Sequence, residues 1–245
     1  MQLQFLGCGD AFGSGGRFNT CFHLRGREVN ALIDCGASSR IALDRFAVDT
    51  NAIDTILITH FHADHFGGIP FFMLHAQHVT QRERPLTIAG PPGLKDWYMR
   101  VMESAFPGST TVPPRFALTL REFAIGQSHT HGKLAVTPFQ ALHDERAGPC
   151  LALRIETEGK VITYSGDTAW TGELVPAAHA ADLFICECYT YERAVRAHMS
   201  LATLSSQLGE IGAKRVVLTH LSADMLAHRD EVPYPIAEDG MVIEV

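Results

Sequence analysis

Metal-binding residue types concentrate in one ten-residue segment, residues 59–68, with the sequence THFHADHFGG. Its three histidines and one aspartate (His60, His62, Asp64 and His65) fall within six consecutive positions. Neutral imidazoles and a carboxylate are the ligands that zinc and similar metals prefer. Four such groups in so short a segment cannot all bind one ion and still leave a position open for catalysis. The spacing therefore predicts two metal ions, the first held by the first two histidines and the second by Asp64 and His65.

A strand and a tight turn must position this segment. Residues 55–58, with the sequence TILI, form an apolar run typical of a buried strand. Gly67 and Gly68 are followed by a second apolar stretch, which predicts a helix soon after the turn. Ligand sites in α/β sheets lie beyond the carboxyl ends of the strands. The four polar side chains are therefore expected at the end of a strand.

Three more candidate ligands have the same context. His143, Asp167 and His220 each follow an apolar, strand-like run, in residues 134–142, 161–164 and 216–219. A carboxylate such as Asp167 can bridge two cations because each of its oxygens can bind one. Asp34 also ends an apolar run, where it could hydrogen-bond a metal-bound histidine. Glu187, at the end of the apolar run 183–188, is either such a partner or structural.

Length and composition indicate an ordinary globular protein. The chain has 245 residues, of which 46% are hydrophobic and 19% charged, and we expect one domain spanning 1–245. We find no apolar run of about 18 residues that would span a membrane, and no amino-terminal signal peptide. Six cysteines in apolar contexts then indicate reduced, buried thiols and a cytoplasmic protein. The net charge of −7 argues weakly against nucleic acid, without excluding RNA.

The pattern of elements predicts two sheets with helices outside them. Strands are expected at residues 2–6, 21–25, 29–34, 55–58, 117–123, 133–139, 150–156, 160–164, 183–188, 216–218 and 241–245. Helices are expected at 38–47, from 69 onwards, at 94–105, at 171–180 and at 201–211. Ser200 is placed to cap the last helix. His129 and His131 are expected in a polar loop.

The seven candidate ligands, taken together, resemble the metal signature of the metallo-β-lactamase-fold superfamily. The resemblance runs in the expected order from residues 5–7 to His220, over nearly the whole chain. It implies an α+β fold of four layers, αββα, with a dinuclear site at one edge. It also implies two Zn²⁺ ions per chain, with Mn²⁺ or iron as alternatives. One ion would be held by His60, His62 and His143, and the other by Asp64, His65 and His220, with Asp167 bridging.

His198 suggests a branch of that superfamily. It lies 22 residues before His220, directly ahead of an expected helix, and resembles the histidine motif of ribonuclease Z and its phosphodiesterase relatives. The resemblance implies that His198 contacts the scissile phosphate and helps to stabilise the transition state. Asp64 is the group expected to orient and deprotonate the attacking water. Both residues are therefore catalytic candidates.

One departure from ribonuclease Z bears on the substrate. Ribonuclease Z enzymes that act on tRNA carry a protruding arm between the positions that match His143 and Asp167. These two residues are only 24 positions apart here, which leaves room for a loop and two strands. We therefore expect a zinc-dependent phosphodiesterase without the arm, acting on a small phosphodiester or an RNA end. Relatives in this branch are often dimers, so the resemblance allows a homodimer.

Three alternative functions remain. The first is an endoribonuclease that processes RNA 3′ ends, and the second is a thioester, lactone or lactam hydrolase on the same metals. The third is an iron redox protein on this scaffold. Such redox proteins carry a glutamate at the position of His62, so the histidine argues against this class.

Overall fold

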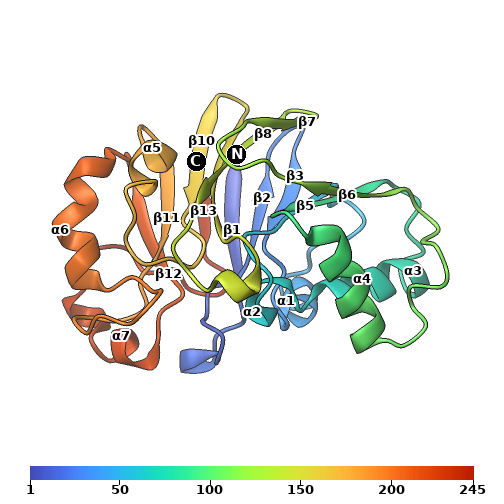
Figure 1. Cartoon of the computed structure of the whole chain (residues 1–245), viewed down its shortest axis with the longest axis horizontal. Coiled ribbons are helices and arrows are strands. Elements are labelled where there is room, and N and C mark those ends of the chain that lie inside the picture. Colours follow the sequence, from blue (N-terminus) through green and yellow to red (C-terminus); the bar gives the residue numbers. More distant parts are fainter.

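Two β-sheets, packed face to face, form the centre of the protein, which a computed structural model describes over residues 1–245 (Figure 1). The first sheet has the strand order β13 (Val242–Glu244), β1 (Gln2–Gly7), β2 (Cys21–Arg25), β3 (Asn30–Ile33), β4 (Thr55–Leu57), β5 (Leu86–Gly90) and β6 (Leu118–Glu122). The second has the order β12 (Val216–Thr219), β11 (Leu183–Glu187), β10 (Lys160–Tyr164), β9 (Leu151–Thr157), β8 (Leu134–Gln140) and β7 (His129–His131).

Helices cover the outer face of each sheet. The first sheet is covered by α1 (Ser39–Arg45), α2 (Ala63–Phe66), α3 (Ile69–His78) and α4 (Leu94–Ala105). The second is covered by α5 (Leu174–Ala178), α6 (Leu201–Ile211) and α7 (Ala223–Ala227). Three short 3₁₀ helices are η1 (Ser14–Gly16), η2 (Glu145–Ala147) and η3 (Arg229–Glu231). None of the helices is long and apolar enough to cross a membrane.

Three separate hydrophobic clusters define four layers. The cluster between the sheets includes Phe22, whose ring meets Phe5 and Tyr164 edge-on at centroid distances of 4.9 and 5.0 Å. A second cluster lies between the first sheet and α1 to α4, and a third between the second sheet and the other helices. The order helix, sheet, sheet, helix is the predicted αββα architecture of an α+β protein.

Both sheets mix parallel and antiparallel pairing, and this positions the functional residues. Strands β3, β4, β5 and β6 are mutually parallel, as are β10, β11 and β12. Parallel strands end at the same edge of a sheet. The residues that follow β3, β4, β10, β11 and β12 are therefore collected at one edge of the two-sheet core.

Most expected elements are present, and the differences have physical reasons. Strand β5 was not predicted: its sequence, LTIAG, is a short run that lies between two prolines. His129–His131 was predicted as a loop, which is wrong, because it forms the edge strand β7 against β8. An edge strand with exposed side chains carries no apolar alternation, so its sequence does not differ from that of a polar loop.

Candidate active site

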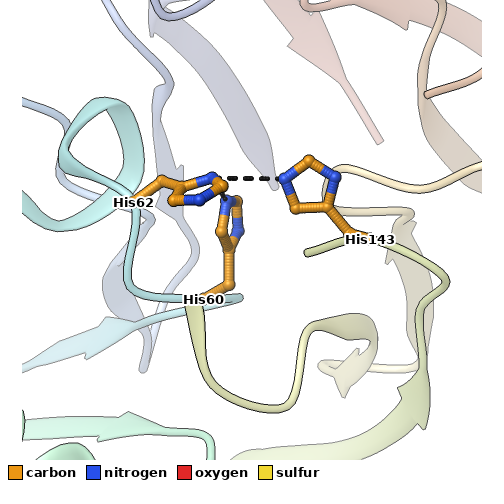
Figure 2. Close-up of side chains that lie close together, drawn as sticks. All are labelled: His60, His62 and His143. Carbon is orange, nitrogen blue, oxygen red and sulfur yellow. Dashed lines mark hydrogen bonds between the residues drawn. The ribbon is translucent and has the colours of Figure 1, made fainter. Parts of the chain in front are cut away.

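Three histidine side chains from two distant segments converge beyond the carboxyl end of β4. His60 and His62 belong to the turn between β4 and α2, and His143 follows β8. The Nδ1 atom of His62 lies 3.2 Å from Nε2 of His60 and 3.2 Å from Nε2 of His143. Figure 2 shows the three rings gathered around one point. One donor atom from each ring lies within 4.8 Å of the others, so the three, here called the histidine cluster, could share an ion.

A second group, here called the mixed cluster, consists of Asp64, His65, Asp167 and His220, all buried. Nε2 of His65 lies 3.3 Å from Oδ2 of Asp64 and 3.2 Å from Oδ1 of Asp167. Nε2 of His220 lies 3.2 Å from Oδ2 of Asp167. Two imidazoles and two carboxylates therefore converge on one small volume, which is a donor set suited to a divalent metal.

Asp167 lies between the two clusters. Besides its contacts in the mixed cluster, its Oδ2 atom is 4.0 Å from Nε2 of His60 and 3.8 Å from Nε2 of His143. The preceding Gly166 has φ +60°, and a Cβ on it would lie 2.4 Å from the carbonyl oxygen of Leu151. Only glycine allows this turn so close to β9. The turn brings Asp167 between the two clusters.

Two unpaired buried atoms and an ionised carboxylate make the clusters fit a divalent metal. Nε2 of His65 and Oδ1 of Asp167 are buried and have no hydrogen-bond partner. An unpaired buried polar atom costs about 1–3 kcal/mol, so native proteins rarely keep one without a reason. Burial opposes ionisation of Asp167, but His220 and His65 outweigh it and hold the pKa of this carboxyl well below its usual range. A divalent cation would pair with the ionised carboxylate and with both orphaned atoms.

Asp34 orients His65 from the side away from the clusters. Its Oδ2 atom accepts a hydrogen bond from Nδ1 of His65 at 2.6 Å. Its two oxygens also accept bonds from the backbone N–H and the hydroxyl of Thr59, both at 2.8 Å. Because Nδ1 of His65 faces Asp34, Nε2 points to the mixed cluster, where the neutral ring would offer its lone pair to a metal. The sequence predicted this kind of role for Asp34.

Strained backbone occurs at three non-glycine residues around the site. Asp34, Ala197 and His220 have φ values of 57°, 66° and 59°. Such conformations cost of order 1–3 kcal/mol each and gather at functional sites, where surrounding structure enforces them. At Ala197 the result is visible, because its carbonyl oxygen accepts a hydrogen bond from Nδ1 of His143 at 2.8 Å. The strained turn thereby fixes the ring of a cluster histidine.

His198 lies beside both clusters and is held by a buried carboxylate. Its Nδ1 atom donates a short hydrogen bond to Oε1 of Glu187, which is completely buried at the end of β11. The other oxygen of Glu187 accepts from the backbone N–H of Thr168 at 2.5 Å. The His198 ring stacks on Tyr189, with centroids 4.6 Å apart, and lies 4.8 Å from the ring of His143. The sequence left Glu187 open between a supporting and a structural role, and its bond to His198 favours the former.

The Glu187–His198 pair is electrostatically coupled. Burial and the nearby Asp167 raise the pKa of Glu187 to about 7, against the opposing charge of His198. For His198, burial lowers the pKa, but the charge and hydrogen bond of Glu187 outweigh it and raise the pKa to about 9. His198 therefore carries a proton at neutral pH, with Nε2–H free of Glu187.

All eight residues singled out as ligands or catalytic groups lie together, although their spacing in the sequence spans 160 positions. Sequence reasoning missed Asp144, whose Oδ2 lies 3.9 Å from Nε2 of His62 and 2.7 Å from the guanidinium of Arg146. The only available signal was its position next to His143.

Comparison with known proteins identifies the family. The family model described as "Anti-Pycsar protein Apyc1" matches residues 1–234. The chain belongs to this family. Among curated proteins, this Apyc1-family chain is also similar to ribonuclease Z of Methanothermobacter thermautotrophicus. The two are 27% identical over an alignment of 301 positions, which covers 100% of this chain and 97% of the relative.

Two solved structures share the fold of this chain. Human tRNase Z, short form, is 26% identical, with a TM-score of 0.80 over 100% of this chain and 99% of that one. The metallo-β-lactamase fold protein YhfI from Bacillus subtilis gives the same TM-score and coverage at 22% identity. The Apyc1-family chain has the metallo-β-lactamase fold. It is a hydrolase that uses a divalent metal.

Proposed function

We propose that the protein is a phosphodiesterase for small phosphodiesters that works with two metal ions, which we expect to be zinc. The observation that carries this proposal is the position of His198, held by Glu187 beside both clusters. The metal ligands alone would serve many hydrolases of this fold. A protonated histidine next to them suits a substrate with an anionic phosphate, because it can donate a hydrogen bond to a phosphate oxygen.

The proposed ligand assignment follows the two clusters. One ion would be held by the histidine cluster and the other by Asp64, His65 and His220, with Asp167 shared between them. When bound, divalent cations lower the pKa of water from about 15.7 to near 7 and offset negative charge on a phosphate. Zinc suits a site of imidazole nitrogens and carboxylate oxygens, and manganese or iron is the alternative.

Asp64 is proposed to orient the attacking water and accept its proton. Its carboxylate lies in the mixed cluster and is almost fully buried. Burial raises its pKa, but the neighbouring His65 outweighs this and lowers the pKa below the usual value of an aspartate. The group is therefore ionised at neutral pH and able to accept a hydrogen bond.

His198 is proposed to act as the proton donor. Glu187 takes up the Nδ1–H of its ring, so Nε2–H is left to donate to a phosphate oxygen or to the leaving oxygen. The buried carboxylate keeps the imidazolium form populated at neutral pH. Glu187 thus acts through His198, as a positioning residue.

Two features favour a small substrate over tRNA. The segment between His143 and Asp167 contains only η2, β9, β10 and their turns, which leaves no room for a protruding arm. The chain also has a net charge of −7, and affinity for a polyanion rests largely on lysine and arginine contacts to phosphates. The second candidate is RNA 3′-end processing, which the similarity to ribonuclease Z favours.

Substitution of His198 tests the proposal. His198→Ala should lower kcat for a phosphodiester with an alkoxide leaving group, such as a cyclic nucleotide, about 10²–10⁴-fold, the usual contribution of an acid–base group, while the metal content stays at the wild-type level. His179, an exposed histidine in neither cluster, provides the control, and His179→Ala should keep wild-type turnover. Equal turnover in the two variants would reject the donor role of His198, and no turnover of phosphodiesters by the metal-loaded wild type would bring the thioester or lactone hydrolase forward.

A further inference from the structure

A cavity of about 690 Å³ lies between α3, α4, β6 and the loop 106–117 that joins the last two. The two helices lie side by side at the end of the molecule opposite α6 and α7 (Figure 1). The cavity shares no lining residue with the histidine cluster, the mixed cluster or the smaller cavity of about 320 Å³ beside His62. It is therefore separate from the place where the proposed hydrolysis would occur.

The walls of the cavity are hydrophobic and carry no formal charge. Ten of its 18 lining residues are hydrophobic, and none is an aspartate, a glutamate, a lysine or an arginine. Tyr98 and Met102 line it from α4, where they are one helical turn apart, and Met73 and Gln77 do the same from α3. A charged ligand would lose its hydration here without gaining an ionic partner. The lining therefore selects uncharged molecules.

Hydrogen bonds hold the loop 106–117 against the end of α4. The carboxylate of Glu103 accepts bonds from the backbone N–H of Gly108 and from the hydroxyl of Thr110, both at 2.8 Å. The hydroxyl of Ser109 donates to the carbonyl oxygen of Met102 at 3.0 Å. These three bonds fix the first half of the loop, so that it forms a wall and does not fold into the space.

The second half of the loop is anchored on the other side. Phe116, which lines the cavity, packs against Arg82, with the guanidinium carbon 5.5 Å from the ring centroid. Arg82 is buried and donates to the backbone carbonyl oxygens of Thr50 and Pro85 at 3.0 and 2.7 Å. Since both halves of the loop are fixed by the protein itself, the cavity is formed before any ligand arrives. Preformed walls of this kind are typical of small-molecule sites.

Gln77 gives the cavity a hydrogen-bond donor. Its Oε1 atom accepts a bond from the backbone N–H of Arg115 at 3.0 Å, whereas its Nε2 amide group forms no hydrogen bond within the protein. The hydroxyls of Ser109 and Thr110, which also line the cavity, already donate to α4. The free amide therefore favours a ligand that carries a hydrogen-bond acceptor.

We propose that this cavity is a second ligand site, which binds an uncharged hydrophobic small molecule carrying a hydrogen-bond acceptor such as a ketone. Its volume lies within the range of about 300–1,000 Å³ that such sites have. The methionines of the lining can adapt to the shape of a ring system. A bound molecule would also cover the apolar side chains of Met99 and Val112, which line the cavity and are 47% and 64% exposed.

A matched pair of fluorescent probes tests the site. Prodan, 6-propionyl-2-(dimethylamino)naphthalene, is a flat, uncharged ketone whose emission moves to shorter wavelength in apolar surroundings. 6-(Dimethylamino)-2-naphthoate has the same ring system with a carboxylate in place of the ketone. Prodan should bind the metal-loaded protein in a saturable way, and the carboxylate should bind at least about tenfold more weakly, because its charge has no partner. Inorganic phosphate, which would bind at the metals, should not displace Prodan.

Three variants localise the binding. Met99→Trp and Leu74→Trp add bulk to the cavity from α4 and α3, and each should weaken Prodan at least about tenfold. Gln77→Glu keeps the oxygen that accepts from Arg115 and removes the amide donor, so Prodan should bind about 2- to 12-fold more weakly. Ser104→Trp, at an exposed position of α4 outside the lining, is the control and should stay within about twofold of the wild type.

The outcomes are independent of phosphodiester hydrolysis. Thermal unfolding shows which variants are folded, and Met99→Trp changes a side chain that is already half exposed, so it keeps the test valid if Leu74→Trp does not fold. No saturable Prodan binding, equal affinity for the two probes, or equal affinity of Met99→Trp and the wild type would overturn the site. Prodan binding that disappears as the chain self-associates would assign the cavity to a second copy of the chain, which also contradicts the proposal.

Discussion

At the scale of single residues, Asp167 is the carboxylate on which both clusters depend. It approaches His65, His220, His60 and His143 within 4.0 Å. Asp167→Ala removes the anion between two cations, and we expect the purified variant to lose one or both of the metal equivalents bound by the wild type. Metal analysis of the dialysed protein measures this. Asp96→Ala, at an exposed position on α4, should bind as much metal as the wild type, and full occupancy in Asp167→Ala would contradict the bridging assignment.

Glu187 raises the pKa of His198, and the dependence of kcat on pH should show this effect. The folded-state pKa of His198 is raised to about 9, so the donor form is present below that pH and is lost as the pH rises through it. Glu187→Gln removes the negative charge and keeps the shape. The alkaline limb of kcat against pH should therefore move to lower pH in this variant, with bound metal unchanged. A limb that stays in place would mean that His198 does not set it.

At the scale of elements, α6 begins three residues after His198 and depends on the capping residue Ser200. The Oγ atom of Ser200 accepts a hydrogen bond from the backbone N–H of Thr203 at 3.2 Å. Ser200→Ala should cost about 0.5–2 kcal/mol, which for a chain of this size corresponds to a fall in Tm of roughly 1–8 °C. Thermal unfolding of Ser205→Ala, an exposed position inside the same helix, should stay within about 0.5 kcal/mol of the wild type. Similar Tm values for both variants would show that the capping hydrogen bond does not stabilise the protein measurably.

Sequence patterns predicted the parts of this fold that have strong periodicity. The apolar runs before His60, Asp167 and His220 marked buried strands, and the rule that ligands follow strand ends placed these residues at one edge. The pairing of His198 with Glu187 had no such signal, because the two residues meet only through the loop between β11 and α6. The contact between the stacked rings of Phe61 and Trp97, whose centroids are 5.5 Å apart, joins residues 36 positions apart on different elements and was equally hidden.

At the scale of the whole molecule, the fold places the site at an open edge with short connections around it. The homodimer, the cytoplasmic location and the single domain expected from the sequence stay predictions, and sedimentation of the purified protein tests the first. The position of the site at an open edge favours access for a compact substrate. The two clusters and His198 lie next to one another, a cavity of about 320 Å³ lined in part by His62 opens beside them, and the segment from His143 to Asp167 stays within the second sheet and its turns.

The most direct test of the central proposal compares two substrates of the zinc-loaded wild-type protein. Steady-state kcat/KM should be measured for a small phosphodiester, either bis(p-nitrophenyl) phosphate or a cyclic nucleotide, and for a precursor tRNA under the same conditions. We predict ready hydrolysis of the small diester and poor cleavage of the tRNA, because the chain is acidic and lacks a tRNA-gripping arm. Efficient cleavage of the precursor at its 3′ end, with no activity on small diesters, would contradict the proposal and establish the ribonuclease instead.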